Sequence, residues 1–503
     1  MRDALGEQPR AAAHIALLLA AGLAVRLYLI YRYPIIFGGD TIARLAHPDH
    51  ILLSHQLPLL QVAIHYLSAI SSDPILVRYF MAVVGSVAGL GFYLAMSDLV
   101  PRSVALSASL LFVANPLILA DSVVPYQEIL MLAGLLFALH FAYTQRWPLA
   151  SLSLGVACLS RYEAWPACPL LALAYLHQSG WRPRTLVAAA ALFGWAPLGW
   201  IAYNRGLTPV GSSAVEWSLN PERVLRWAHL GVMTLRSSPL PALLLAGVGV
   251  AVFWRRRLFA LPVYRLVMAF LALFLVAILF SAHGVGENPE RAVTEREAHV
   301  PLVVVTMLAA LGLGALPRYR SAITALCVAV GLWMADRYIR RVTSEPHLAL
   351  SYQVARYLER QVPSGDVIAI LARARELEEY LAALERTRGP AAVQQTLRAL
   401  ERLDMGKPPD YQRIVVHSRS GKDRLVSYAM PSLGRFADEN RTETHLPAQP
   451  LRSPGWIVLW SDFEATDSAE ADLAAQVRAQ SPRHVFQQGG VWVRLYPLGG
   501  AER

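Results

Sequence analysis

Several acidic residues and arginines lie at the ends of strongly apolar segments, where their charges would meet a membrane surface. The first is Asp40, which follows two glycines in the stretch Phe37-Gly38-Gly39-Asp40-Thr41. A carboxylate held at such a surface is suited to act as a general base toward an acceptor hydroxyl or amine. The alternative interpretation is that Asp40 caps a helix beginning at Thr41, because Asp is a favoured N-cap residue.

Three later connections place further charges at the same predicted membrane face. Acidic groups there suit an acceptor-activating base, and arginines suit a phosphate clamp, because the planar guanidinium can bind two phosphate oxygens. The residues concerned are Asp121, Glu128, Arg161, Glu163, Arg291 and Arg296. Each also has a structural interpretation. Asp121 would cap the next helix, Arg161 and Glu163 would pair with one another, and the charged run at 287–297 would be a solvated loop.

The elements that must position these charges are transmembrane helices. Of 503 residues, 55% are hydrophobic and only 16% are charged, whereas soluble domains carry about 25% charged residues. A spanning helix needs about twenty apolar residues. We therefore predict a polytopic α-helical membrane protein with about eleven transmembrane helices, at 12–30, 75–97, 103–120, 126–143, 149–160, 163–178, 185–203, 239–254, 262–282, 299–316 and 320–338.

The positive-inside rule orients these helices. With the N-terminus in the cytoplasm, the short inner connections hold Arg102, Arg146, Arg182, Arg184, Arg255, Arg256, Arg257, Arg318 and Arg320. The outer connections are 31–74, 121–125, 204–238 and 283–298. The apolar stretch from 11 to 30 is longer than the apolar region of a signal peptide and has no small-residue cleavage site, so we expect a retained first helix.

The net charge of +10 fits cytoplasmic loops beside anionic lipid rather than nucleic-acid binding. The three cysteines, Cys158, Cys168 and Cys327, are too few for a disulfide framework. All three stand in apolar runs, where cysteine usually behaves as a small buried hydrophobe. No metal-ligand spacing involves any of them.

Residues 343–503 have the composition of a soluble protein and would lie outside the membrane. Strands are expected at 366–371, 413–417, 425–429, 456–460 and 491–496, and helices at 349–361, 376–384 and 391–403. Strands that alternate with helices indicate a small α/β domain. The predicted domains are therefore a membrane module, 1–340, whose first outer loop is 31–74, and a C-terminal extracytoplasmic α/β domain, 343–503.

Short motifs in the predicted outer turns resemble those of a known superfamily. They are Gly39-Asp40 with Arg44-Leu45-Ala46, then His55-Gln56-Leu57-Pro58-Leu59, then Arg161-Tyr162-Glu163-Ala164-Trp165. In order and in membrane side they resemble bacterial membrane glycosyltransferases of the GT-C superfamily. The nearest branch contains protein O-mannosyltransferases and lipid A aminoarabinose transferases, and the resemblance covers most of residues 12–360.

The resemblance implies roles for individual residues. Asp40 matches the first-loop acidic residue that serves as catalytic base or acceptor binder, and His55 begins a segment similar to a His-Pro-Pro-Leu motif. Asp121, or else Glu128, matches a second-loop acidic residue. The remaining matched positions are Arg161 with Glu163 in the third turn, and Arg291 or Arg296 at the donor phosphate.

Two departures from the superfamily pattern matter. Many relatives carry Asp-Glu in the first loop, whereas this chain has Asp40-Thr41, so no residue here takes the role of that Glu. The Asp-x-Asp metal pattern of oligosaccharyltransferases is absent from both early loops. We therefore predict no required metal and no cofactor.

The predicted function is transfer of a hexose or pentose from a polyprenyl-phosphate donor to an extracytoplasmic acceptor, with inversion, in the bacterial cytoplasmic membrane. The partners would be this donor, the lipid bilayer and an unidentified acceptor, with no nucleic acid. The alternatives are a lipid-linked sugar flippase, a non-catalytic scaffold, and an O-antigen-ligase-like transferase that uses a diphosphate donor. A flippase should need polar residues at mid-membrane, whereas most of the charges here fall at helix ends.

Overall fold

The structure is a computed structural model, and it describes most of the helical part of the chain. The described residues are 2–37, 41, 44–45, 57–71, 75–204, 225–280, 295–344, 349–350, 353–354, 357, 367–373, 411–417, 442–443, 456–460, 482–488 and 491–497. The chain folds into two compact units. The first, here called the helical unit, comprises residues 1–32, 52–63 and 77–339, and the second comprises 33–51, 64–76 and 340–503.

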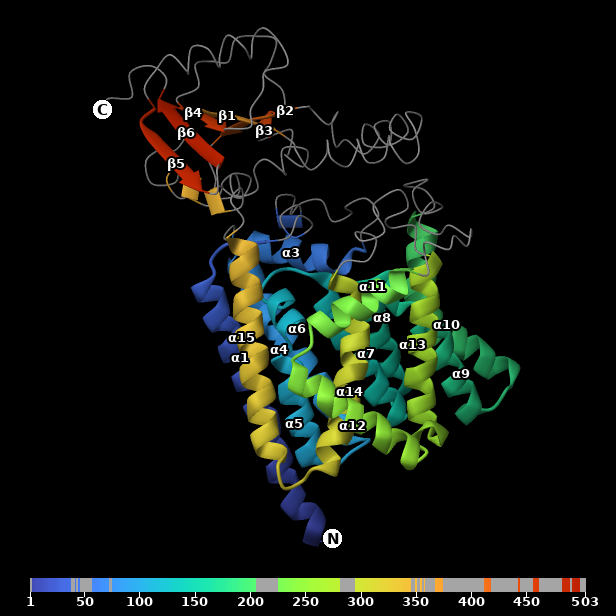
Figure 1. The fold of residues 1–503 in the computed structure, drawn as a ribbon. Coiled ribbons are helices and arrows are strands. Elements are labelled where there is room, and N and C mark those ends of the chain that lie inside the picture. The colour runs from blue at the N-terminus through green and yellow to red at the C-terminus, as the bar shows by residue number, and fades with distance from the viewer. Residues whose placement is uncertain are drawn as a thin grey trace. The chain divides into compact units, whose positions relative to one another are not determined.

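Helices dominate the described residues (Figure 1), and all of them except α3 and α11 coincide with the predicted apolar segments. They are α1 (Arg2–Arg32), α3 (Leu59–Ile70), α4 (Ile75–Ser97), α5 (Arg102–Val113), α6 (Pro116–Asp121), α7 (Gln127–Tyr143), α8 (Trp147–Cys158), α9 (Ala167–Ser179), α10 (Pro183–Asn204), α11 (Leu225–Arg236), α12 (Leu240–Arg255), α13 (Pro262–Phe280), α14 (His299–Ala315) and α15 (Arg320–Thr343). Short 3-10 turns occur at η1 (Tyr162–Ala164), η4 (Leu258–Ala260) and η6 (Glu295–Ala298).

One predicted helix, 103–120, is wrong as a continuous element. α5 ends at Val113, and α6 begins at Pro116 with Asn115 as its N-cap. The Asn115 side chain accepts hydrogen bonds from the backbone N–H groups of Leu117 and Ile118, at 3.1 and 3.3 Å. Proline has no N–H to donate and disfavours a helical conformation in the residue before it, so the chain bends here.

α11 lies within a predicted outer connection, 204–238, and was not expected as a helix. It meets α12 at an angle of 116° across the break at Ser237–Pro239. Trp227 of α11 donates from its indole nitrogen to the carbonyl oxygen of Leu275 at 2.9 Å. Buried Arg226 donates to the carbonyl oxygen of Ile278 at 3.2 Å. Both bonds fasten α11 to the end of α13.

The helical unit is that of a multi-pass membrane protein. Within the described residues, four helices are long and apolar enough to span a bilayer: Ala11–Arg32, Ile75–Ser97, Pro183–Tyr203 and Arg320–Thr343. The bent pair of α11 and α12 makes a fifth if it counts as one span, and the other apolar helices are shorter. The count of eleven spans therefore stays a prediction.

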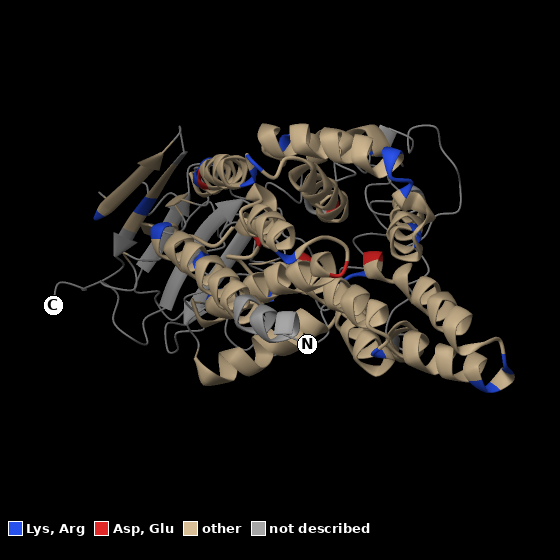
Figure 2. Ribbon diagram, turned by 90° about the horizontal axis from the view of Figure 1, so that it is seen from below, with Lys and Arg blue, Asp and Glu red and all other residues tan. Residues whose placement is uncertain are grey.

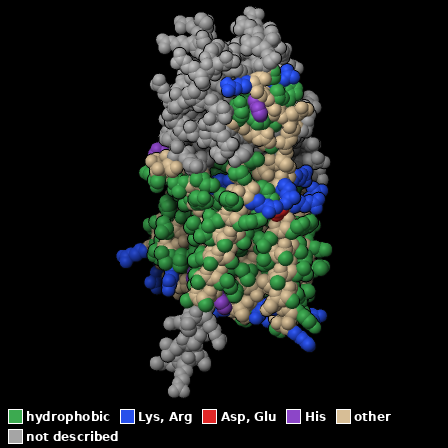
Figure 3. All heavy atoms as spheres, turned by 90° about the vertical axis from the view of Figure 1, so that its left-hand side faces the viewer, with side chains coloured by type: hydrophobic (Ala, Val, Ile, Leu, Met, Phe, Trp, Pro, Cys, Tyr) green, Lys and Arg blue, Asp and Glu red, His purple; other side chains and the backbone are tan. Residues whose placement is uncertain are grey.

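The surface of the helical unit matches a bilayer environment. Hydrophobic side chains cover the flank drawn in Figure 3, with arginines near its two ends. Seen from below in Figure 2, the helices carry few charged residues along their lengths. Large apolar side chains such as Leu152, Trp254 and Trp333 are about 60% exposed. Such exposure is expected where side chains contact lipid and would be unfavourable in water.

The second unit contains a six-stranded mixed sheet in the order β3-β2-β1-β4-β6-β5. Its strands are β1 (Val367–Arg373), β2 (Tyr411–His417), β3 (Thr442–Glu443), β4 (Trp456–Trp460), β5 (His484–Gln488) and β6 (Val491–Pro497). Among the described strands, β1 and β4 pair in parallel and the other four pairings are antiparallel.

Four predicted strands are confirmed as β1, β2, β4 and β6. β3 and β5 were not predicted; β5 is an edge strand whose residues are mostly exposed, so it lacks the apolar alternation of a buried strand. The predicted strand 425–429, the helices 376–384 and 391–403, and most of 349–361 lie outside the described residues. A separate C-terminal α/β domain stays a prediction.

Glycines bring α12 and α14 into backbone contact. A methyl group on Gly249 would overlap the carbonyl oxygen of Leu308, and one on Gly312 would overlap the carbonyl oxygen of Leu245. Small residues allow this close approach, and van der Waals packing is a main source of stability between helices in lipid.

We expect Gly249→Ala to lower the free energy of unfolding in detergent by about 2 kcal/mol, because the added methyl group must force the two helices apart. Gly247, two residues earlier in α12, has no atom within 4 Å of such a methyl group, so Gly247→Ala is the matched control. Thermal unfolding followed by circular dichroism measures both variants. Equal midpoints for the two would contradict the proposed packing.

Candidate active site

Four of the predicted site residues have described side chains: Asp121, Glu128, Arg161 and Glu163. Asp40, His55 and Arg291 lie outside the described residues. Arg296 lies in η6, where the backbone alone is described. The geometry below therefore concerns the predicted outer turns around Asp121 and Arg161 and the start of α14, and roles for the other residues stay predictions.

Arg161 lies between two carboxylates from different turns. It precedes η1 in the connection between α8 and α9, and one terminal nitrogen of its guanidinium lies 3.1 Å from a carboxylate oxygen of Glu128. Its Nε donates to Glu163 at 3.0 Å, and a second guanidinium nitrogen contacts the other oxygen of Glu163. The Glu128 side chain is only 1% exposed, against 14% for Arg161 and 21% for Glu163.

The carboxylates stabilise the charged form of this guanidinium. Burial alone lowers the pKa of Arg161, but Glu163, Glu128 and Glu297 together outweigh it and hold the pKa above its ordinary value. The predicted pairing of Arg161 with Glu163 is confirmed, and Glu128 extends it. Because two acidic groups already neutralise Arg161, it would have to exchange one of them to bind a phosphate.

A second buried pair joins Asp121 to His299. Nε2 of His299, the first residue of α14, lies 3.2 Å from Oδ2 of Asp121, the last residue of α6, and both side chains are at most 2% exposed. Asp121 does not cap the following helix, because the N-cap of α7 is Tyr126. Sequence reasoning missed His299; the available signal was a polar residue at the outer end of an apolar segment.

Two fully buried arginines support the turn between α6 and α7. Arg26 of α1 donates from Nε to the hydroxyl of Ser122 at 2.7 Å, and Arg78 of α4 donates from Nε to the carbonyl oxygen of Val123 at 2.8 Å. Neither arginine was a predicted site residue. Both stand inside apolar segments, where a charged residue is costly and therefore functionally informative.

The turn that carries Arg161 is held by bonds to three other segments. The backbone N–H of Leu59 donates to the carbonyl oxygen of Leu159 at 3.1 Å. Trp165 donates from its indole nitrogen to the carbonyl oxygen of Cys158 at 3.0 Å, and Trp200 donates to the hydroxyl of Tyr162 at the same distance. Burial raises the pKa of Tyr162, the bond from Trp200 opposes this, and Glu163 adds to it.

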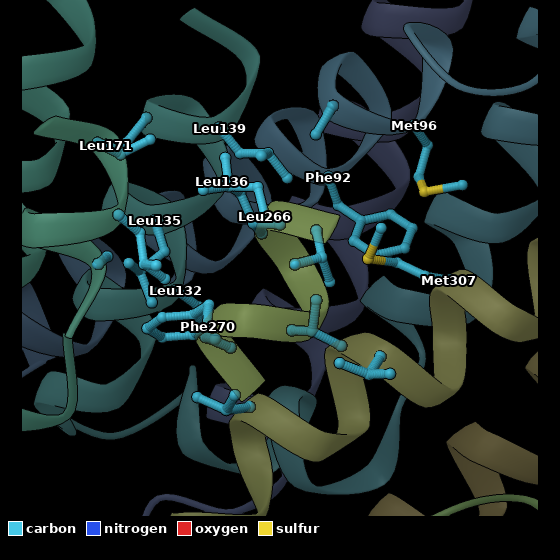
Figure 4. Close-up of a pocket in the computed structure, with 18 residues that line it drawn as sticks. Phe92, Met96, Leu132, Leu135, Leu136, Leu139, Leu171, Leu266, Phe270 and Met307 are labelled. Atoms are coloured by element: carbon cyan, nitrogen blue, oxygen red, sulfur yellow. The ribbon is translucent and has the colours of Figure 1, made fainter. Parts of the chain in front are cut away.

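An apolar cavity lies between helices near these charges, and Figure 4 draws the residues that line it. It has a volume of about 90 Å³ and lies between α4, α7, α9, α13 and α14. Leu132 lines it one turn after Glu128, and Val303 lines it one turn after His299. The side chains labelled in Figure 4 are all leucine, phenylalanine or methionine.

Among the residues that the structure describes, no group of three or more His, Cys, Asp or Glu side chains could hold a metal ion. The first-loop carboxylate, Asp40, is not among them. The absence of a required metal stays a prediction.

Comparisons with known proteins identify the fold. No family model matches this chain, and no curated protein matches its sequence. The aminoarabinose transferase ArnT from Cupriavidus metallidurans, in its apo state, matches with a TM-score of 0.50 and 14% identity, covering 97% of this chain and 98% of that one. This chain therefore shares the fold of that structure, in agreement with the fold that the resemblance predicted.

Weaker matches come from the oligosaccharyltransferase of Archaeoglobus fulgidus. Its complex with Zn and sulfate matches with a TM-score of 0.42 and 14% identity, over 74% of this chain. The oligosaccharyltransferase AglB from the same organism, in complex with an inhibitory peptide and a dolichol-phosphate, matches with a TM-score of 0.40 and 13% identity, over 76% of this chain. This chain spans 57% and 60% of the lengths of those two chains.

The cluster around Arg161 predicts coupled losses of stability. Arg161→Met should cost about 3 kcal/mol of unfolding free energy, because it removes the guanidinium from the buried carboxylate of Glu128. Adding Glu128→Gln to that variant should recover part of the loss, since the amide carries no charge.

A double-mutant cycle by chemical denaturation in detergent measures this coupling. Glu163→Gln is the control, and it should cost less because Glu163 is more exposed than Glu128. Strictly additive losses for Arg161→Met and Glu128→Gln would contradict the pairing.

Proposed function

We propose that this protein transfers a sugar from a polyprenyl-phosphate donor to an acceptor on the outer side of the cytoplasmic membrane. The observation that carries the proposal is the position of the charged cluster directly above the apolar cavity. Glu128 and His299 each lie one turn from a cavity-lining residue, Leu132 and Val303. A lipid-linked sugar has the same polarity, with an apolar tail joined to a charged phosphate.

The shared fold supports this reading. Over 97% of its length this chain matches a structure of an aminoarabinose transferase. A fold hosts many functions, so the chemistry must be argued from the site.

In the proposed reaction the acceptor oxygen or nitrogen attacks the anomeric carbon from the face opposite the phosphate. The bond between the anomeric carbon and the phosphate oxygen breaks, its electron pair stays on that oxygen, and the anomeric centre inverts. Asp40 takes the proton of the acceptor as general base. His55 belongs to the same first loop and is proposed to help hold the substrate.

Negative charge grows on the donor phosphate as the bond breaks, and preorganised cations stabilise that charge best. We assign this task chiefly to Arg291 and Arg296. Arg161 is paired with Glu128 and Glu163, so its role is to hold those carboxylates unless the phosphate displaces one of them. Asp121, paired with His299, is the second proposed catalytic carboxylate.

The proposed topology has a cytoplasmic N-terminus, about eleven spans and an outer C-terminal domain. α1 and α15 both begin at the lower end of the helical unit in Figure 1. Arg318 of the turn before α15 and Arg320, the first residue of α15, are at that end. We assign this end to the cytoplasmic side, because basic connections are favoured there beside anionic lipid. The turns that carry Asp121 and Arg161 lie at the helix ends opposite the basic connections.

The first test of the function is Asp40→Asn. Asn caps a helix as well as Asp does, but it cannot accept a proton at neutral pH. We expect normal expression and thermal stability, with sugar transfer reduced by about 100-fold or more. The assay offers radiolabelled polyprenyl-phosphate sugars and native membrane extract to the purified full-length protein. Transfer at the wild-type rate would refute the role of base and leave the capping role.

The second test blocks the cavity. Leu135 lines it, so Leu135→Trp should fill the space, weaken donor binding and raise KM by about 10-fold while the folded state persists. Leu152→Trp is the matched control, because Leu152 of α8 is 61% exposed and does not line the cavity. Equal KM values for the two variants would argue against a lipid tail in this cavity.

A further inference from the structure

Two buried cysteines face each other across the turn that carries Arg161. Cys158 is the last residue of α8 and Cys168 is the second residue of α9, and their Sγ atoms are 3.4 Å apart. The two side chains are 1% and 9% exposed. The third cysteine, Cys327, lies in α15 and has no such neighbour among the described residues.

We infer that Cys158 and Cys168 are a site of oxidative modification, and that they form a disulfide in the mature protein. A disulfide has an S–S distance of about 2.05 Å, so the two sulfur atoms must approach by about 1.4 Å. The two sulfur atoms already touch, and their residues lie at the two helix ends beside one tight turn.

The compartment favours oxidation, and this step rests on the proposed topology rather than on the proposed reaction. Arg161, within this turn, is paired with Glu128 at the start of α7. Both therefore lie at the helix ends opposite the basic connections at Arg146 and Arg182. Those connections face the cytoplasm by the positive-inside rule, so the turn faces the outer side, where disulfides form and persist.

The oxidation is a thiol–disulfide exchange. Cys158 and Cys168 each lose one S–H bond and together gain one S–S bond, releasing two protons and two electrons. The electron acceptor is the disulfide of a thiol-oxidising exchange protein on the outer side, which is reduced to a dithiol. Because both cysteines are buried, exchange must occur while the protein folds, before α8 and α9 close over them.

The disulfide would constrain a turn that is central to the site. The ring that it closes contains Arg161 and Glu163, together with Trp165, whose indole already bonds the carbonyl oxygen of Cys158. A covalent link across the base of the turn would limit how far Arg161 can move from Glu128. This consequence holds whatever reaction the protein catalyses.

Counting free thiols in the full-length protein tests the inference. Cells are quenched in acid, and the protein is unfolded in detergent with N-ethylmaleimide before any reductant is added. We expect one adduct by mass spectrometry, on Cys327, and two further adducts after reduction and a second labelling step. Three adducts before reduction would overturn the inference, as would two adducts placed on Cys158 and Cys168.

Cysteine variants serve as matched controls. Cys327→Ser should give no adduct before reduction, whereas Cys158→Ser should free Cys168 and give two. Because these counts do not depend on turnover, they separate failure of this inference from failure of the proposed sugar transfer. If Cys158→Ser gives a single adduct before reduction, Cys168 is oxidised without Cys158. That result would also overturn the inference.

Discussion

The ion pair between Arg161 and Glu128 is the interaction on which the candidate site depends. Charged groups near a bilayer are tolerated when they are paired, and a carboxylate that is 1% exposed needs such a partner. This pair joins the start of α7 to the turn between α8 and α9. The pair of Asp121 and His299 joins the end of α6 to the start of α14 in the same way.

Buried arginines extend this principle to the turn between α6 and α7. Arg26 and Arg78 reach it from α1 and α4, so the position of Asp121 depends on two helices that are distant in the sequence. Below these polar contacts the helices enclose a cavity lined by apolar side chains. The site thus has the polarity of a lipid-linked substrate, charged at one end and apolar at the other.

Much of the helical architecture could be predicted from local sequence. Apolar length is a property of each segment alone, and every predicted span contains a helix in the structure. The errors came from turn chemistry and from amphipathic surface helices. Asn115-Pro116 divides one predicted span, and α11 has too many polar residues to register as a membrane segment. The spacing of charges likewise predicted the pair of Arg161 and Glu163, which are two residues apart.

The sequence by itself determined that this is a membrane protein, which segments form its helices, and which turns carry charge. Only the tertiary structure decided that Glu128 joins Arg161, that His299 holds Asp121, and that Cys158 lies against Cys168. The physical reason is that hydrophobicity acts on each segment independently, whereas a salt bridge or a thiol contact requires two side chains within about 4 Å. That distance is set by how the helices pack, which no single segment encodes.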